Sequence, residues 1–170
     1  MERTTRKPNR LRNYDYSAPG AYFLTVCTHE KRCLLSRIPV GEELAPPAVR
    51  LTAIGGIVEK QVRQLPGRFP GLTVEHFVIM PNHIHLLLHL KQGPGGASSS
   101  PTVDIRHVLQ AFKSITTVEC HKSGICSGPL WQRSYHDHII RDEADHRRIA
   151  EYIETNPARW TEDCFYIFEP

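Results

Sequence analysis

Two apolar stretches joined by a short turn constrain the fold of this 170-residue chain more than any other feature of its sequence. Residues 74–80 and 83–90 are each rich in aliphatic side chains, and Pro81-Asn82 separates them. Apolar runs of this length bounded by turn residues are typical of β-strands, and so short a connection favours antiparallel pairing. We therefore predict a β-hairpin over residues 74–90.

The second stretch carries histidines at alternating positions. Because successive side chains of a strand point to opposite faces, one face would hold Ile84, Leu86, Leu88 and Leu90, and the other His83, His85, Leu87 and His89. His83 and His85 could then reach one ion together, whereas His89 would lie about 13 Å farther along the strand. Two imidazoles are a common beginning of a transition-metal site, although a half-buried strand with scattered histidines is the alternative reading.

Other segments complete an alternation of strands and helices. Residues 93–101, rich in Gly, Ser and Pro, are expected to form a flexible connector, and Pro66-Gly67 is expected to end the first helix. Hairpins that alternate with long helices predict an α+β fold in which helices cover an antiparallel sheet. Strands are predicted over residues 21–28, 33–38 and 135–141, the first two pairing with each other, and helices over residues 51–64, 103–120 and 142–156.

Positive charge is concentrated at the N-terminus. The formal net charge is +3, and residues 1–12 hold one acidic residue, Glu2, against five basic ones, namely Arg3, Arg6, Lys7, Arg10 and Arg12. The remainder of the chain is therefore close to neutral. A basic arm on a near-neutral body is typical of a protein that holds a polyanion such as a nucleic acid, and a solvated terminus is the alternative.

Composition limits the class of protein. The 40% of hydrophobic residues and 23% of charged residues are enough for a packed core and argue against wholesale disorder. No apolar run approaches the ~20 residues needed to cross a bilayer, so we expect no membrane partner. Five cysteines without a CxxC spacing fit reduced thiols in the cytoplasm better than a disulfide framework.

The last predicted helix has a polar side on which Asp145, Arg148, Tyr152, Asn156 and Arg159 lie within about 40° of one another. Tyr152 and Asn156 are four residues apart, so their side chains can address the same point in space. A tyrosine at the rim of a core would be the structural alternative.

Together the two patterns suggest a chemistry. A phenol has a pKa near 10, so it needs a nearby cation to become a nucleophile at neutral pH. A divalent metal on His83 and His85, with the Asn156 amide oxygen as a further ligand, could polarise a phosphodiester that Tyr152 attacks. The basic arm would supply an electrostatic grip on the nucleic acid.

Further basic residues are candidate DNA contacts. Lys113 and Arg106 lie on the polar side of the second long helix, Arg133 lies in an aromatic-rich stretch, and Arg148 lies on the tyrosine helix. A solvated helix face explains Lys113 and Arg106 equally well. For residues 131–138, which hold Arg133, the alternative is a strand edge that packs aromatic side chains. Tyr135, beside Arg133, is a competing nucleophile by composition alone, and His136 and His138 form a second His-x-His pattern that lacks a comparable third ligand. We prefer Tyr152 because a rigid helix also carries its companion amide.

Three motifs, in the right order, resemble one known family over residues 14–160. Residues 77–85 (FVIMPNHIH) resemble the HUH motif, His, bulky apolar, His, of single-tyrosine, single-strand DNA transposases. Residues 131–141 (WQRSYHDHIIR), followed by 152–157 (YIETNP), and the opening residues 14–23 (YDYSAPGAYF) are similar to the REP-associated tyrosine transposase branch.

The resemblance implies a ferredoxin-like antiparallel sheet covered by helices on one face, with His83 and His85 on its central strand. It places the nucleophile on Tyr152 and the third metal ligand on Asn156, with Mg²⁺ or Mn²⁺ as the cofactor. The substrate implied is single-stranded DNA beside a hairpin, cleaved to a 5′-phosphotyrosine and a free 3′-hydroxyl. The chain would divide into a basic arm (1–20), the catalytic domain (21–160) and a tail (161–170). A homodimer is left open, because a partner's helix completes the active site in some relatives.

Two other functions fit the sequence. The chain could be a domesticated, non-catalytic module that binds DNA hairpins, although a pure binder has no need of His83, His85, Tyr152 and Asn156 together. It could also be a small metallohydrolase with another substrate, in which Tyr152 would be dispensable.

Overall fold

The computed structural model describes residues 14–39, 49–91 and 103–167. The basic residues 1–12 of the predicted arm (1–20) and the predicted connector (93–101) lie outside these residues. Two short 3₁₀ segments, η1 and η2, accompany the main elements. In chain order the elements are β1 (Gly20–Cys27), η1 (His29–Lys31), β2 (Ser36–Arg37), β3 (Arg50–Leu51), α1 (Ala53–Arg68), β4 (Leu72–Ile79), β5 (His83–Leu90), α2 (Ile105–Lys122), β6 (His136–Ile139), α3 (Glu143–Thr155) and η2 (Asn156–Glu162).

A four-stranded antiparallel sheet forms the centre of the molecule, with the strand order β4-β5-β1-β6. The elements β1-α1-β4-β5-α2-β6 follow the ferredoxin-like β-α-β-β-α-β plan, which confirms the predicted α+β fold. The predicted hairpin is β4 and β5, joined by the turn at Pro81-Asn82, and β5 also pairs with β1 along its whole length. Both histidines of interest therefore lie on a central strand.

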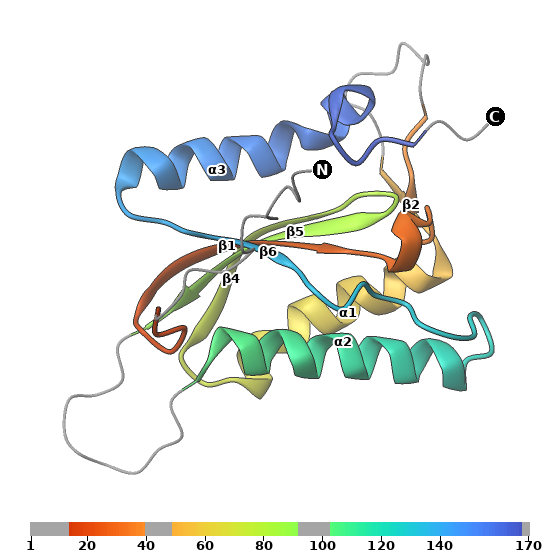
Figure 1. Cartoon of the computed structure of the whole chain (residues 1–170), viewed down its shortest axis with the longest axis horizontal. Helices are drawn as coiled ribbons and strands as arrows, with labels where there is room; N and C mark the ends of the chain where they lie inside the picture. Colours follow the sequence, from red (N-terminus) through yellow and green to blue (C-terminus); the bar gives the residue numbers. More distant parts are fainter. Residues whose placement is uncertain (1–13, 40–48, 92–102, 168–170) are drawn as a thin grey trace, which may run out of the picture.

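Alternation along β5 separates two cores. Ile84, Leu86, Leu88 and Leu90 belong to the larger core, which the sheet shares with α1 and α2. Leu87 points to the opposite face and packs with Ile149 and Ile153 of α3. Figure 1 shows α1 and α2 together below the sheet and α3 above it. The helical cover on one face is as expected, and α3 adds a layer on the other face that the prediction did not include.

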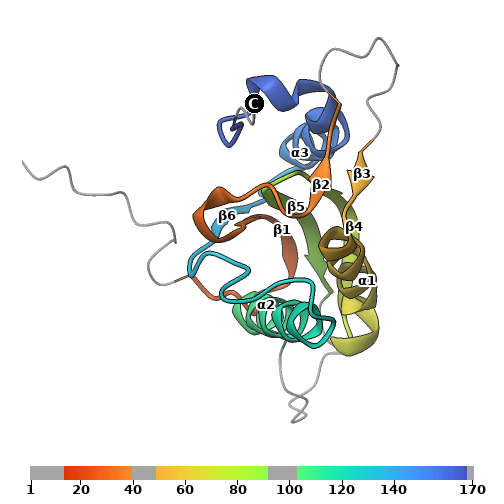
Figure 2. The ribbon, with the colours of Figure 1, turned by 90° about the vertical axis from the view of Figure 1, so that its right-hand side faces the viewer.

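Two local predictions were wrong. Residues 33–38 were expected to pair with the first strand, but β2 pairs with β3 in a separate two-stranded sheet, seen beside the main sheet in Figure 2. β1 has no free edge for β2, because β5 and β6 already occupy both of its sides. Helix α1 continues through Pro66-Gly67 to Arg68, because buried Leu65 anchors that turn and a proline there costs one backbone hydrogen bond.

The ends of the chain take part in the packing. Tyr16, within the segment expected to be an arm, is 3% exposed and belongs to the larger core. Trp160 in η2 is 5% exposed.

Among the described residues, no helix is both long and apolar enough to cross a membrane.

The start of α1 passes very close to another segment. Thr52 is its N-cap, and the Thr52 hydroxyl accepts a hydrogen bond from the Gly55 amide at 3.0 Å. The Leu35 carbonyl oxygen accepts a hydrogen bond from the Thr52 amide at 3.0 Å and lies directly over Gly55. A Cβ at Gly55 would overlap that oxygen, whereas a Cβ at the adjacent Gly56 would meet nothing within 4 Å. The Gly-Gly pair that weakens the helix in sequence terms thus has one glycine that the packing requires.

We expect Gly55→Ala to lower the free energy of unfolding by about 2 kcal/mol or more, because the new methyl group forces backbone apart. Gly56→Ala is the matched control, and it should raise that free energy by up to about 1 kcal/mol through helix propensity. Urea denaturation followed by circular dichroism measures both. Equal effects of the two substitutions would contradict the close approach of Leu35.

Candidate functional site

The centre of the site is the histidine pair at the start of β5. His83 is 0% and His85 1% exposed, and both lie on the face of the sheet that α3 covers. Their Nε2 atoms are 3.0 Å apart, so both rings address one point. The turn at Pro81-Asn82 places His83 as the first residue of the strand. Because residues two apart in a strand point to the same face, His85 lies beside His83.

Neighbouring side chains orient both imidazoles. The Nδ1 atom of His83 lies 2.8 Å from Oδ1 of Asn82, whose Nδ2 in turn donates to the Phe165 carbonyl at 2.8 Å. Because that amide nitrogen is engaged, its oxygen faces His83, so Nδ1 of His83 carries the proton and Nε2 keeps its lone pair. The Nδ1 atom of His85 lies 2.8 Å from the Thr25 hydroxyl, which can accept as well as donate. Such partners fix the tautomer and ring direction of metal-binding histidines.

Burial keeps both histidines neutral. It lowers the pKa of His83 to about 3, and it lowers the pKa of His85 to about 3 with a further contribution from His83. The neutral imidazole is the form that ligates a metal ion, so no proton has to leave either ring at physiological pH.

Helix α3 brings the tyrosine and the amide to this pair. The Tyr152 hydroxyl lies 3.4 Å from Nε2 of His85, and the Tyr152 ring meets Phe23 edge-on. Asn156, one turn later, is 3% exposed, and among the described residues its Oδ1 has no hydrogen-bond partner. The four residues singled out in the sequence are therefore in one place.

Asp163 is a residue that sequence reasoning missed. Its side chain is 1% exposed, and its Oδ2 lies 3.9 Å from Nε2 of His83 and accepts a hydrogen bond from Nδ2 of Asn156 at 3.1 Å. It falls in residues 161–170, which were expected to be a tail. The one signal in the sequence was composition, because Phe165, Tyr166 and Phe168 make this segment more aromatic than a solvated tail.

These donors suit a divalent cation. His83, His85 and Asp163 each offer a ligand atom, and the three atoms lie within 4.8 Å of one another. The buried Oδ1 of Asn156 is a fourth possible ligand atom, and it has no hydrogen-bond partner in the described protein. Imidazole nitrogen with carboxylate and amide oxygen is a donor set that a divalent cation accepts, so the cluster could bind a metal.

Tyr152 stands between two hollows. A cavity of about 510 Å³ lies on the side of Phe23, His85 and Arg148, and one of about 140 Å³ lies on the side of Asn156 and Asp163. Partial burial raises the pKa of Tyr152 to about 12, and the negative charge of Asp163 adds to the shift. The phenol is thus protonated unless positive charge is brought beside it.

The predicted DNA-contacting residues have different surroundings. Arg148 is exposed at the rim of the larger cavity and pairs with Asp145, and Arg133 is exposed on the loop before β6. The Lys113 ammonium donates to the carbonyl oxygens of Gln132, Arg133 and Ser134, so it holds this loop. The arm residues lie outside the described part of the chain.

The competing residues lie elsewhere or have other partners. Tyr135 is 5% exposed and belongs to the larger core, away from α3. His138 pairs with Asp145 of α3 at 2.7 Å, while His136 is exposed and lines the larger cavity. Of the two His-x-His patterns, the one on β5 has the convergent geometry.

Comparisons of the sequence with known proteins agree in direction. The profile of the family described as "Transposase IS200 like" matches residues 58–156, more than half of the chain. An uncharacterised protein of Haemophilus influenzae is 31% identical over 175 residues, which cover 95% of this chain and 93% of that protein. A second protein of the same bacterium, provisionally named a REP-associated tyrosine transposase, is 27% identical over 99 residues, which cover 51% of this chain and 54% of that protein.

A solved structure shares the fold. The structure of a REP-associated tyrosine transposase bound to a REP hairpin matches this one with a TM-score of 0.60 and 22% identity, over 88% of this chain and 73% of that one. This likeness supports the same α+β architecture that the strand order shows.

We expect Thr25→Val to weaken Mn²⁺ binding about ten-fold, because the isosteric side chain cannot hydrogen-bond Nδ1 of His85 and leaves that ring unoriented. Isothermal titration calorimetry with the full chain measures the affinity. Thr73→Val on β4 is the matched control, since Thr73 pairs with His89 at the far end of β5. An unchanged affinity in Thr25→Val would show that Thr25 does not orient the ligand.

Proposed function

Because the chain belongs to the family of IS200-like transposases, we propose that it cleaves and rejoins single-stranded DNA beside hairpins through a covalent bond to Tyr152. The observation that carries this proposal is the position of the Tyr152 hydroxyl, 3.4 Å from a histidine whose Nε2 atom faces that of its neighbour. A tyrosine next to a candidate metal-binding pair suits phosphodiester transfer through a phenol, because a nearby cation is one way to activate such a nucleophile.

The proposed reaction forms one bond to phosphorus and breaks another. The Tyr152 oxygen bonds to phosphorus, the bond from phosphorus to the 3′ oxygen of the preceding nucleotide breaks, and a 5′-phosphotyrosine forms. The phenol loses one proton, and the leaving 3′ oxygen gains one. Rejoining is the reverse reaction with another 3′-hydroxyl as the nucleophile.

Different residues of the site would bind the metal ion and orient the tyrosine. His83, His85 and Asn156 would hold Mg²⁺ or Mn²⁺, which when bound supplies the positive charge that favours the phenolate and offsets the charge on the phosphate. Edge-on contact with Phe23 and the rigidity of α3 orient the Tyr152 ring toward that point. Two histidines favour Mn²⁺ by ligand type, and availability in the cell favours Mg²⁺.

Electrostatics and the structural relative support the DNA partner. The relative of known structure was solved bound to a REP hairpin, and we extend hairpin binding to this chain as a proposal. The basic arm would contact phosphates, with Arg148 beside Tyr152 and Arg133 on the loop before β6 as further contacts. Lys113 is a phosphate contact only if it leaves its carbonyl partners.

We expect Tyr152→Phe to abolish the covalent adduct, because no oxygen remains to bond phosphorus. The full chain is incubated with Mn²⁺ and a hairpin-bearing single strand, and the adduct is followed on a denaturing gel. Tyr135→Phe is the matched control and should form adduct at the wild-type rate. An adduct that persists in Tyr152→Phe contradicts the assignment, and absence of any scission by the wild type in Mg²⁺ or Mn²⁺ favours a hairpin-binding module instead.

We expect deletion of residues 1–12 to weaken hairpin binding at least ten-fold at moderate salt, since up to five phosphate contacts are lost. The slope of the logarithm of affinity against the logarithm of salt concentration should become shallower by as much as about 4. Fluorescence anisotropy across a salt series measures both. Lys60→Gln, an exposed position on α1, is the control, and an unchanged slope after the deletion would show that the arm is only a solvated terminus.

A further inference from the structure

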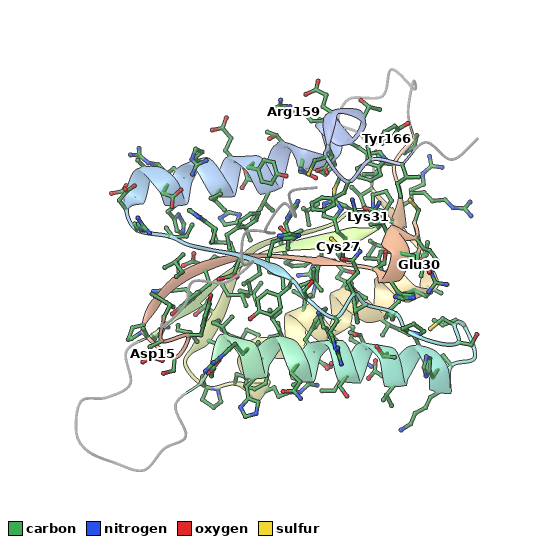
Figure 3. The ribbon with its side chains drawn as sticks, in the orientation of Figure 1. Asp15, Cys27, Glu30, Lys31, Arg159 and Tyr166 are labelled. Atoms are coloured by element: carbon green, nitrogen blue, oxygen red, sulfur yellow. The ribbon has the colours of Figure 1, made fainter. Side chains whose placement is uncertain are left out.

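The residues that follow α3 fold back over the histidine pair. Figure 3 shows Arg159 and Tyr166 on this C-terminal turn, above Cys27 at the end of β1 and Lys31 in η1. The Phe165 ring lies 4.8 Å from the His83 ring. The Lys31 ammonium also contacts the Phe165 ring, 4.9 Å from its centroid. Residues 163–165 are thus packed against the site.

Asp163 is held in one position by this turn. Its Oδ1 accepts a hydrogen bond from the Phe165 amide at 2.7 Å, and its Oδ2 accepts one from Nδ2 of Asn156 at 3.1 Å. The second hydrogen bond engages the amide nitrogen of Asn156. The amide oxygen of Asn156 is therefore the atom available to ligate a metal ion. One carboxylate therefore fixes the orientation of a predicted ligand.

Among the described residues, no lysine or arginine forms an ion pair with this carboxylate. A buried carboxylate is costly unless a positive group or a metal accompanies it. Within the described ranges, the one ion-pair contact of Asp163 is with Nε2 of His83 at 3.9 Å, which is longer than a hydrogen bond. The site thus brings together two imidazole lone pairs, one amide oxygen and one carboxylate oxygen, and no lysine or arginine of the described residues pairs with that carboxylate.

We propose that Asp163 is a further ligand of the metal held by His83, His85 and Asn156, and that the C-terminal segment is therefore part of the metal site. This inference rests on the proposed function. The four residues would hold the ion, and the ion would supply positive charge beside the Tyr152 hydroxyl. The carboxylate also lowers the net charge of the loaded site, which strengthens retention of the ion.

A second contact ties the same segment to His83. The Phe165 carbonyl accepts from Nδ2 of Asn82, and Oδ1 of Asn82 orients the His83 ring. The segment thus contributes one ligand directly and positions another through Asn82.

The competing role for Asp163 has opposite consequences. If the carboxylate merely occupied the place of the substrate phosphate, DNA would displace it, and its removal would speed cleavage. If it is a ligand, its removal weakens metal binding with or without DNA and slows cleavage at limiting metal.

The test is Mn²⁺ titration of the full chain without DNA, with free Mn²⁺ followed by electron paramagnetic resonance. We expect Asp163→Asn, which preserves the acceptor for the Phe165 amide, to weaken Mn²⁺ binding ten-fold or more. Glu162→Gln is the matched control, because Glu162 is an exposed neighbour that pairs with Arg159, and its affinity should stay within two-fold of wild type. Thermal unfolding without metal checks that the variants are folded, and Asp163→Ala replaces Asp163→Asn if the latter is not.

The outcomes separate the two proposals. Wild-type affinity in the folded Asp163 variant, with binding lost in His83→Ala, overturns the inference and leaves the proposed function intact. Wild-type Mn²⁺ affinity in His83→Ala would contradict the metal site of the proposed function itself. In the adduct assay, the Mn²⁺ concentration for half-maximal adduct should rise about ten-fold in Asp163→Asn, and faster adduct formation at saturating Mn²⁺ would instead identify Asp163 as a displaced competitor.

Discussion

Alternation of side chains along β5 is the constraint on which both the core and the site depend. Ile84 and Leu86 are 0% exposed in the larger core, and His83 and His85 are almost equally buried on the opposite face. A shift of one residue in register would exchange the two sets, burying imidazoles among aliphatic side chains of α1 and α2. Pairing of β5 with both β1 and β4 prevents that shift. The strand register that stabilises the sheet therefore also places the histidine pair.

The position of Tyr152 depends in turn on how α3 docks. Ile149 and Ile153 pack on Leu87, and His146 lies 2.6 Å from Glu75, so the helix is held both at its apolar centre and at the β4 edge. Contacts on one side of a helix fix its rotation as well as its distance. That rotation directs Tyr152 toward His85, although nothing in α3 alone specifies the partner.

Periodic elements could be predicted from the sequence, and irregular ones could not. The hairpin and the long helices have repeating apolar patterns that reflect which face is buried, and Asp142 marks the start of α3 as an N-cap. β2 has only two residues, too few for a pattern, so its pairing with β3 was missed. Asp163 lies on an irregular turn and meets a histidine 80 positions earlier, a contact that no local spacing encodes.

Polar satisfaction at the site differs from that of several buried hydroxyl groups elsewhere in the interior. The buried hydroxyls of Thr28, Ser36 and Thr116 each donate to a backbone carbonyl, so those positions are complete without a ligand. At the site, by contrast, the Asn156 oxygen lacks a partner in the described chain and two imidazole nitrogens face each other. Leaving polar groups unsatisfied in a buried place costs stability, on the order of 1–3 kcal/mol for each group. A bound cation removes that cost, so metal binding should be coupled to the stability of the C-terminal turn and not only to catalysis.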